Sequence, residues 1–483
     1  MENENNVEEQ QTPAPDTGGL QRGKKRWIGI LVLLGSMLVI YLGFSFFFMS
    51  HYYFGTTISG VDCGGRNKKQ VTEQILNPTV DLTVTLAARD NVKVSVMTEG
   101  LDINYTFDDT LYQINASQNG FNWIGALFYN KDYDLPVYIT YDEEQLTREL
   151  KQLPIFDQKI CEVPRDAYIG EYQTDTGAYS IVSETLGNTL NFDKTLRSIE
   201  DAFTRMVLSQ KELVIDLEQT ECYEKPLIYS DDSKLVQALQ TANTYVSTKI
   251  TYDWNGQQEV IDGDIIKDWI MVDQTTVNLD EDGIYEYLKS LSKKNDTYGK
   301  NRMFTTTQGN EIELRSGAYG WKTDVQTETE ELVPKIKTGV TEAREPVYRC
   351  QGYVKGADDI GDSYVEINLS AQHLYLYEDG AVVFESDFVS GNMSNGCATP
   401  AGVFGITYRT KNAVLRGDNY ETPVHYWMPF NGNIGMHDAT WRGAFGGDIY
   451  LTRGSHGCIN LPLASAERIY GYMKTGFPVI CYY

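Results

Sequence analysis

The sequence has few basic residues, few histidines and few cysteines for its length of 483 residues. Lysine and arginine number 41 against 67 aspartates and glutamates, which gives a formal net charge of -26. Nucleic-acid binding needs clustered basic side chains, so this balance argues against nucleic acid as a partner. The acidic surface is instead expected to be well solvated and to keep an exposed protein monomeric.

The seven cysteines include no Cys-x-x-Cys pair, the spacing typical of structural zinc sites. Because seven is an odd number, at least one thiol stays unpaired within the chain even where disulfides persist. Only five histidines occur, and four of them lie close together near the C-terminus: His373, His425, His437 and His456. This clustering makes the last quarter of the chain the candidate for catalysis.

A long uncharged run near the N-terminus predicts a transmembrane helix. Residues 27–49 carry no charge and, at about 1.5 Å per residue, form a helix long enough for a bilayer core. A cleaved signal peptide is the alternative, but its apolar region is shorter and ends at small residues, whereas this run ends in Phe-Phe-Phe-Met. Four basic residues between positions 22 and 26 precede the run, so residues 1–26 are predicted to be a disordered cytoplasmic tail.

The part after the anchor is then expected to be extracellular, and its patterns divide it into four segments. These are a juxtamembrane segment (50–80), two modules (81–227 and 228–347) and a C-terminal domain (348–483). The juxtamembrane segment is rich in turn residues. It contains Cys63, which follows Asp rather than a small residue and is interpreted as structural instead of lipid-modified.

The two modules resemble each other and predict a duplicated α+β unit. Helical patterns follow Asp142 and Asp280, which lie 138 residues apart. The tripeptide Gly-Ala-Tyr recurs at 177–179 and 317–319, which lie 140 residues apart. Neither module contains a histidine, so the modules are expected to space the C-terminal domain from the membrane rather than to catalyse a reaction.

Short alternating segments broken by glycine begin at Tyr364 and predict mainly β structure in the C-terminal domain. Residues 364–369, 373–377 and 382–384 are predicted strands, with a turn at 378–380. The fold class expected for the whole chain is therefore multidomain, with an N-terminal transmembrane helix, two α+β modules and a mainly-β C-terminal domain.

Residues 455–460 combine the groups that a nucleophilic thiol needs. A cysteine near its ordinary pKa becomes reactive only beside an imidazole or a helix terminus, and His456 lies two positions before Cys458. Gly457 lets a substrate carbonyl approach main-chain N–H groups, which predicts an oxyanion hole with the N–H of Cys458. Ser455 can orient a histidine, and Asn460 can donate and accept hydrogen bonds. A tight turn with a buried cysteine is the alternative.

The wider spacing changes this interpretation. His437 precedes Ser455 by 18 positions, and the pattern His, 17 residues, Ser-His-Gly-Cys-Ile-Asn closely resembles the signature of the L,D-transpeptidase family. The resemblance also includes Gln372, residues 399–402 (Thr-Pro-Ala-Gly) and residues 434–438 (Ile-Gly-Met-His-Asp). The anchor and the duplicated modules look like the wall-binding modules that accompany this catalytic domain in monoderm bacteria.

The resemblance implies a mainly-β L,D-transpeptidase catalytic domain that cross-links peptidoglycan. Cys458 would attack the third-position diamino acid of a donor stem tetrapeptide and release D-alanine, leaving a thioester. The side-chain amine of an acceptor stem would then form a cross-link between third positions. His437 would be the base with Ser455 at its partner position, although the residues alone do not decide between His437 and His456. His456 and Gly457 would shape the oxyanion site, and carbapenems would acylate Cys458.

Several residues near the motif are candidates for substrate binding: Tyr426, Trp427, Trp441, Arg442 and Asn460. Core packing is the alternative for the aromatic residues, and Arg442 is expected to pair with a substrate carboxylate. Asp438 can orient His437, but a solvated carboxylate is at least as well supported, because adjacent side chains rarely face each other.

The remaining cysteines in this region are given no catalytic role. Cys397 is interpreted as structural or as the disulfide partner of Cys350 or Cys481. A zinc site built from His437, His456 and Cys458 is a minor alternative. No metal and no cofactor are expected.

Two further functions stay open beside cross-linking. An L,D-carboxypeptidase would hydrolyse the same acyl-enzyme, and an inactive chain would serve as a cell-wall-binding scaffold. The expected partners are peptidoglycan stem peptides and, through one N-terminal helix, the membrane. The expected location is the cell membrane, with a single span, a cytoplasmic N-terminus and a catalytic domain facing the cell wall.

Overall fold

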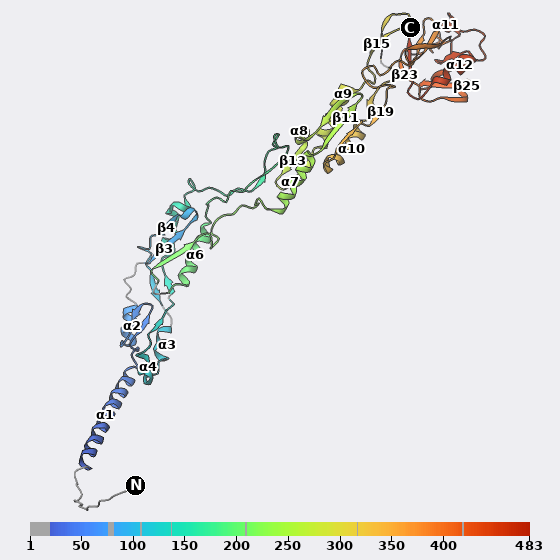
Figure 1. Cartoon of the computed structure of the whole chain (residues 1–483). Helices are drawn as coiled ribbons and strands as arrows, with labels where there is room; N and C mark the ends of the chain where they lie inside the picture. Colours follow the sequence, from blue (N-terminus) through green and yellow to red (C-terminus); the bar gives the residue numbers. More distant parts are fainter. Residues whose placement is uncertain are drawn as a thin grey trace, which may run out of the picture. The chain divides into compact units, whose positions relative to one another are not determined.

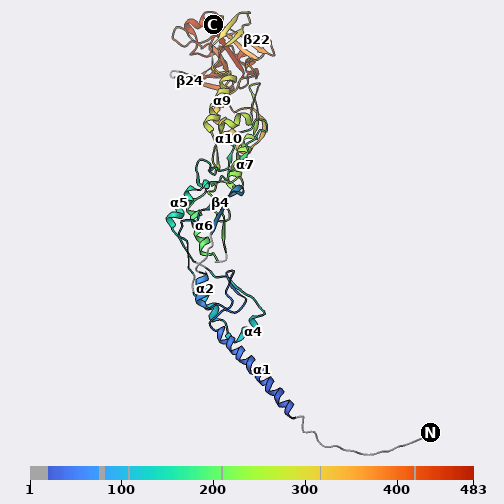
Figure 2. The same ribbon diagram turned by 90° about the vertical axis from the view of Figure 1, so that its left-hand side faces the viewer.

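The computed structural model describes residues 20–75, 82–106, 109–136, 138–207, 210–315, 317–417 and 420–483. Figure 1 and Figure 2 trace the chain from its N-terminus to its C-terminus in two perpendicular views. The chain divides into two units. The first comprises Met1–Asp166 and Glu184–Leu227, and the second comprises Ala167–Ser183 and Ile228–Tyr483.

A long apolar helix, α1 (Leu20–Phe47), begins the described chain. Among the described residues it is the one helix whose length and composition suit a membrane crossing, over Arg26–Phe47. The helix begins seven residues before the predicted start, because arginine, lysine and glutamine are good helix formers and continue it through the basic segment. The predicted disorder of the tail is therefore wrong for residues 20–26, while residues 1–19 lie outside the described residues.

The segment after α1 folds together with residues much later in the chain. Its elements are β1 (Thr56–Ile58), β2 (Val61–Asp62), α2 (Lys68–Ile75), α3 (Thr110–Ala116), η2 (Gly120–Asn122), α4 (Trp123–Ala126) and β6 (Lys131–Tyr133). Strand β1 pairs antiparallel with β2 and parallel with β6. Ile58, Cys63 and Leu111 are buried in one core. The segment predicted as juxtamembrane is thus part of a folded body, because its apolar side chains are buried together with residues 109–135.

The first module packs a three-stranded sheet against two helices. Its elements are β3 (Thr83–Ala87), η1 (Arg89–Asn91), β4 (Lys93–Val96), β5 (Asn104–Thr106), β7 (Tyr138–Thr140), α5 (Glu143–Gln152), η3 (Pro154–Phe156), α6 (Phe192–Thr204) and β10 (Glu212–Asp216). The sheet has the order β10-β3-β4, with β10 parallel to β3. Asp142 caps α5 by accepting a hydrogen bond from the N–H of Gln145. Leu146 of α5 and Ile199 of α6 are buried in the shared core.

The second module repeats this arrangement. Its elements are α7 (Ser233–Val246), β11 (Lys249–Trp254), β12 (Gln257–Ile261), α8 (Gly263–Ile266), η4 (Lys267–Trp269), β13 (Ile270–Asp273), β14 (Thr276–Leu279), α9 (Glu281–Asn295), α10 (Val325–Thr338) and β18 (Thr341–Arg344). The sheet order is β12-β11-β18, with β18 parallel to β11. Asp280 caps α9 through the N–H of Gly283, as Asp142 caps α5. The modules therefore share strand order, strand direction and helix cap.

The hairpin of the first module belongs to the second unit. It consists of β8 (Tyr168–Ile169) and β9 (Ile181–Val182). Ala167 and Ile169 are buried with Leu235 and Ala238 of α7. The chain passes into the second unit again at Ile228, the predicted start of the second module, but residues 167–183 of the predicted first module also belong to the second unit, because this apolar contact joins them to α7.

The corresponding hairpin of the second module packs on the C-terminal domain. It consists of β15 (Arg302–Thr305) and β16 (Glu311–Leu314). Arg302 forms an ion pair with the buried Asp359 at 2.6 Å, and the N–H of Thr307 donates to the buried carboxylate of Glu366 at 3.0 Å. Tyr319 is buried with Val403 and Ile480. The predicted division between residues 347 and 348 is crossed by these contacts in the same way.

Two sheets build the C-terminal domain. Its elements, with two short flanking strands, are β17 (Lys322–Thr323), β19 (Tyr348–Cys350), β20 (Tyr364–Asn368), β21 (His373–Glu378), β22 (Ala381–Asp387), β23 (Gly402–Gly405), β24 (Thr410–Gly417), β25 (Tyr420–Asn431), β26 (Ile434–Asp438), α11 (Ile449–Arg453), β27 (Ile459–Leu461), α12 (Leu463–Tyr472) and β28 (Pro478–Tyr482). The sheets have the orders β22-β21-β20-β28-β23 and β24-β25-β26-β27. One apolar core lies between them and includes Leu376, Met436 and Ile469 of α12. The prediction of mainly β structure is confirmed.

Candidate active site

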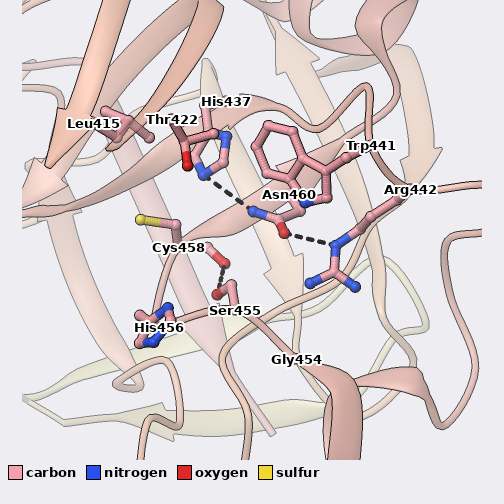
Figure 3. A pocket seen from close by; sticks show the side chains of 10 residues that line it. All are labelled: Leu415, Thr422, His437, Trp441, Arg442, Gly454, Ser455, His456, Cys458 and Asn460. Carbon is pink, nitrogen blue, oxygen red and sulfur yellow. Dashed lines mark hydrogen bonds between the residues drawn. The ribbon is translucent and has the colours of Figure 1, made fainter. Parts of the chain in front are cut away.

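Two neighbouring parallel strands position the central polar side chains. Strand β26 carries His437 and strand β27 carries Asn460, and these residues are register partners. Partners across a strand pair project to the same face of the sheet, so the imidazole and the amide meet. The loop at 455–458 leads directly into β27 and brings Cys458 beside them (Figure 3).

A pocket of about 260 Å³ opens over this part of the sheet. It is lined by Leu415, Thr422, His437, Trp441, Arg442, Gly454, Ser455, His456, Cys458 and Asn460. Seven of these residues were predicted from the sequence. Three were not: Gly454, and Leu415 and Thr422, which come from the β24–β25 hairpin, whose sequence carries no motif. Figure 3 shows the thiol of Cys458 directed toward the side where these two residues lie.

Cys458 lines the pocket and is partly buried. Its Sγ approaches the carbonyl oxygen of Asn433 at 3.6 Å. Burial raises the pKa of the Cys458 thiol to about 11. The group is therefore a protonated thiol at neutral pH, and attack at this pH needs a base that takes the proton.

His437 is buried between two indole rings. Its ring centroid lies 5.8 Å from that of Trp427 and 6.0 Å from that of Trp441. Burial lowers the pKa of His437, so the imidazole is neutral at physiological pH. Nδ1 lies 2.8 Å from the carbonyl oxygen of Asp438, and Nε2 lies 3.0 Å from Nδ2 of Asn460.

The neighbours of His437 determine its tautomer. Arg442 can only donate, and its Nε lies 2.8 Å from Oδ1 of Asn460, so that oxygen accepts. The Asn460 amide nitrogen must then face His437 and donate to Nε2. The ring proton therefore sits on Nδ1 and is donated to the carbonyl of Asp438. Nε2 keeps the lone pair on the side of the pocket, which is the arrangement a general base needs.

Arg442 lines the pocket and also bonds within the protein. It was expected to pair with a substrate carboxylate, but its Nε is bonded to Asn460 and its Nη1 donates to the carbonyl of Arg453 at 2.9 Å. Asn460, predicted to bind substrate, faces His437. Arg442 thus orients Asn460, and Asn460 orients the ring of His437.

Asp438 is buried, so the alternative of a solvated carboxylate is wrong. Its Oδ1 accepts from the main-chain N–H groups of His425 and Tyr426, and Oδ2 lies 2.9 Å from Nδ1 of His425. These bonds hold the carboxylate against strand β25. Asp438 still contacts His437, but through its main-chain carbonyl.

The loop before β27 is closed by Ser455. Its Oγ donates to the carbonyl of Cys458 at 2.6 Å and accepts from the N–H of Gly457 at 3.0 Å. Ser455 therefore shapes the loop instead of contacting a histidine ring. Gly457 has a φ of 120°, which L-side chains rarely adopt, and its carbonyl accepts from Oγ1 of Thr399 at 2.7 Å. Thr399 belongs to the Thr-Pro-Ala-Gly segment and supports the loop from behind.

Tyr426 and Trp427 do not line the pocket, contrary to the prediction that they bind substrate. The hydroxyl of Tyr426 donates to Glu467 of α12 at 2.8 Å. Trp427 is buried behind His437, with its indole N–H bonded to the hydroxyl of Tyr408 at 3.3 Å. Successive residues of a strand face opposite sides, so the pair cannot both face the substrate. Trp441, half exposed, is the aromatic wall of the pocket.

All seven cysteines are unpaired thiols. The predicted pairing of Cys397 with Cys350 or Cys481 is therefore not present. Cys481 is fully buried in the core of the C-terminal domain, where it packs as a small apolar side chain.

Replacing Asn460 with aspartate should raise the pKa of His437. The carboxylate would stabilise the imidazolium and could no longer donate to Nε2, so the pKa of His437 should rise by about one unit or more. The positive charge of Arg442 would offset part of this rise. NMR titration of chain labelled in its histidine rings measures this pKa, and a His437→Gln sample assigns the signal. Asn460→Ala is the matched control, with a smaller shift because no charge is added. An unchanged pKa in Asn460→Asp would disprove the contact between residue 460 and the ring of His437.

Three segments of the chain match models of known protein families. Residues 362–481 match the family model of the L,D-transpeptidase catalytic domain. Residues 94–209 and 230–343 each match a family model described as "Putative peptidoglycan binding domain", which confirms the predicted duplication. Comparison with curated proteins gave no match.

Three solved structures illustrate the similarity. A cysteine-to-serine mutant of an Enterococcus faecium L,D-transpeptidase is 35% identical over 51% of this chain and 100% of that chain, with a TM-score of 0.42. The catalytic domain of an E. faecium L,D-transpeptidase acylated by ertapenem is 42% identical over 25% of this chain and 98% of that chain, with a TM-score of 0.24. An L,D-transpeptidase from Stackebrandtia nassauensis is 26% identical over 28% of this chain and 59% of that chain, with a TM-score of 0.23.

Proposed function

Because the chain belongs to the L,D-transpeptidase family, we propose that it cross-links third-position diamino acids of peptidoglycan stem peptides through a thioester on Cys458. One observation carries this proposal. The Cys458 thiol shares a pocket with the buried, neutral imidazole of His437, whose Nε2 lone pair is on the side of that pocket.

The first half-reaction forms the thioester. Sulfur attacks the carbonyl carbon of the donor's third residue while the thiol proton passes to Nε2 of His437. The bond to D-alanine then breaks, and His437 returns the proton to the leaving amine. Because the resting group is a thiol, attack and proton transfer are coupled. Nε2 must exchange its hydrogen bond with Asn460 for one with the thiol, since one lone pair cannot accept from both.

The second half-reaction forms the cross-link. The acceptor amine attacks the thioester carbonyl, the new amide bond forms, and the carbon–sulfur bond breaks. His437 takes a proton from the amine and returns it to sulfur, which restores the enzyme. In both halves we assign the oxyanion to the N–H of Cys458, because the N–H of Gly457 is already bonded to Ser455. His456, exposed at the pocket, is assigned to substrate contact.

We further propose that α1 is an uncleaved anchor with its N-terminus in the cytoplasm. Two features support it: the apolar stretch Arg26–Phe47 is almost entirely exposed, as expected of a lipid-facing surface, and basic residues precede it. The two modules would then hold wall polymer on the same side as the catalytic domain.

The function is tested with purified full chain in detergent and disaccharide-tetrapeptide as the only substrate. The expected product is a dimer whose mass is that of two substrates less one D-alanine and whose new bond joins two third positions, shown by fragmentation mass spectrometry. Tripeptide without dimer would identify a carboxypeptidase instead. If neither product forms with either diamino acid common in cell walls at the third position, the chain is a scaffold and the proposal is wrong.

A further inference from the structure

Exposed apolar side chains gather in a short segment of the first unit. Residues 120–129, called here the aromatic loop, comprise η2, α4 and the turn that follows. The side chains that project from it are Phe121, Ile124, Leu127, Phe128 and Tyr129, between 41% and 77% exposed. No acidic or basic residue occurs from Thr110 to Asn130. A cluster of this kind marks a surface that contacts something apolar.

The aromatic loop is packed on the C-terminal end of α1 (Figure 1). The hydroxyl of Tyr41 donates to the carbonyl of Phe121 at 2.8 Å, and the indole N–H of Trp123 donates to the carbonyl of Tyr41 at 3.3 Å. The rings of Phe44 and Trp123 lie 4.9 Å apart. Gly120 allows this approach, because a Cβ there would lie 2.4 Å from the carbonyl oxygen of Ser45.

This contact sets the depth of the loop along α1. Tyr41 lies six residues before the end of the helix at Phe47, which is about 9 Å along the axis. The loop therefore lies beside the last turns of the candidate span and not beyond it. Phe46 of α1 is 62% exposed and its ring lies 6.5 Å from that of Phe121, so the two apolar surfaces are continuous.

The backbone of the loop bonds within itself. The N–H groups of Leu127, Phe128 and Tyr129 donate to the carbonyls of Ile124, Gly125 and Ala126 at 3.3, 3.2 and 3.4 Å. Main-chain groups that are already paired can leave water at little energetic cost. The loop thus presents apolar side chains without unpaired N–H groups at these positions.

We propose that the aromatic loop enters the outer leaflet of the membrane beside α1 and forms a second contact with lipid. Its side chains would reach about 5–10 Å into the boundary between headgroups and acyl chains, where tryptophan and tyrosine are enriched. This inference rests on the proposed anchoring of α1. A single helix can rotate and tilt freely, whereas a helix with a loop bonded to its side has one orientation. The loop would therefore fix how the folded body after α1 leaves the membrane.

Lipid is the occupant that the observations favour over a protein. The loop continues the surface of α1, which is exposed and apolar over the whole candidate span. It lies beside the last turns of that span. Its exposed side chains carry no charged group that would select a protein partner.

The test uses full chain reconstituted into vesicles of phosphatidylcholine and phosphatidylglycerol, with tryptophan introduced at the most exposed loop position, Phe128→Trp. The signal is the fluorescence that the introduced tryptophan adds to that of the parent chain. Bromine placed high on the lipid acyl chain should quench this added fluorescence, and bromine near the end of the acyl chain should quench it less. Tyr168→Trp, in the second unit and also exposed, is the matched control and should show no added quenching. Circular dichroism checks that the variants fold alike.

The outcomes separate the two proposals. Flotation of the chain with the vesicles, resistant to alkaline carbonate, tests the anchor, and a chain that does not float refutes the anchor and the loop contact with it. A chain that floats while the introduced Trp stays unquenched by bromolipid and open to aqueous acrylamide refutes the loop contact alone. Shielding from both quenchers would identify a protein contact, such as a second copy, and would also overturn the lipid proposal.

Discussion

Replacing Cys458 with alanine should abolish both the cross-linked product and covalent modification by a carbapenem. Without the sulfur no thioester forms, so cross-linking falls by about a thousandfold or more, equivalent to roughly 4 kcal/mol of transition-state stabilisation. Intact-mass spectrometry of the full chain after incubation with ertapenem measures the adduct, and the disaccharide-tetrapeptide assay measures the product. In the parent chain one adduct per chain is expected.

Cys397→Ala is the matched control for this experiment. Cys397 is another partly exposed thiol of the same domain, and it does not line the pocket. Its variant should keep both the adduct and the product. An adduct of the same mass and yield on Cys458→Ala would show that another residue is acylated, and the assignment of the nucleophile would then be wrong.

Much of the fold was predictable because local patterns determine it. The strands β20, β21 and β22 lie where alternation and the turn at 378–380 place them. The caps at Asp142 and Asp280 begin helices as their patterns indicate. What the sequence did not reveal is which segments pack together over long distances. The segment after α1 folds with residues 109–135, and no local pattern of either segment encodes that pairing.

The hairpins show the same limit. A hairpin that leaves its own module looks in sequence like any other pair of short strands, because alternation identifies a strand but not its neighbour. Only the positions of partners such as Glu366 for Thr307 assign the second hairpin to the C-terminal domain. Domain boundaries drawn from sequence patterns therefore missed that each hairpin packs on the part of the chain that follows its own module.

The sequence predicted which residues form the candidate site better than it predicted the hydrogen bonds between them. The resemblance to the family signature located Cys458, His437 and Asn460, because a signature with a fixed interval between a histidine and a cysteine motif can be recognised from the sequence alone. Hydrogen bonds to main-chain groups leave no signal in the sequence, because every residue has a carbonyl that could accept. The bond of His437 to Asp438 is of this kind, which is why the carboxylate was considered and the carbonyl was missed. The orienting bond from Arg442 to Asn460 likewise depends on side-chain geometry.

Replacing His437 with glutamine should slow acylation of Cys458 by about 10²- to 10⁴-fold at neutral pH, because glutamine cannot accept the thiol proton. The deficit should shrink as pH rises. Burial lowers the pKa of His437, so the parent chain keeps a neutral base and a flat rate through the neutral range. The variant must react through thiolate that forms by itself, and burial raises the pKa of that thiol to about 11. Its rate should therefore climb about tenfold per pH unit up to that value.

The measurement is the rate of ertapenem acylation, followed by intact mass from about pH 6 to about pH 10. Over this range attack assisted by a neutral base is distinguished from attack by free thiolate, whose fraction rises with pH. His456→Gln is the decisive comparison, because the sequence left both histidines as candidates for the base. It should keep the flat profile, since His456 lies exposed at the pocket while Nε2 of His437 is held beside Asn460. His373→Gln, where the parent ring contacts Asp387 away from the residues that line the pocket, should behave as the parent chain. A steep profile in His456→Gln with a flat one in His437→Gln would transfer the role of base to His456.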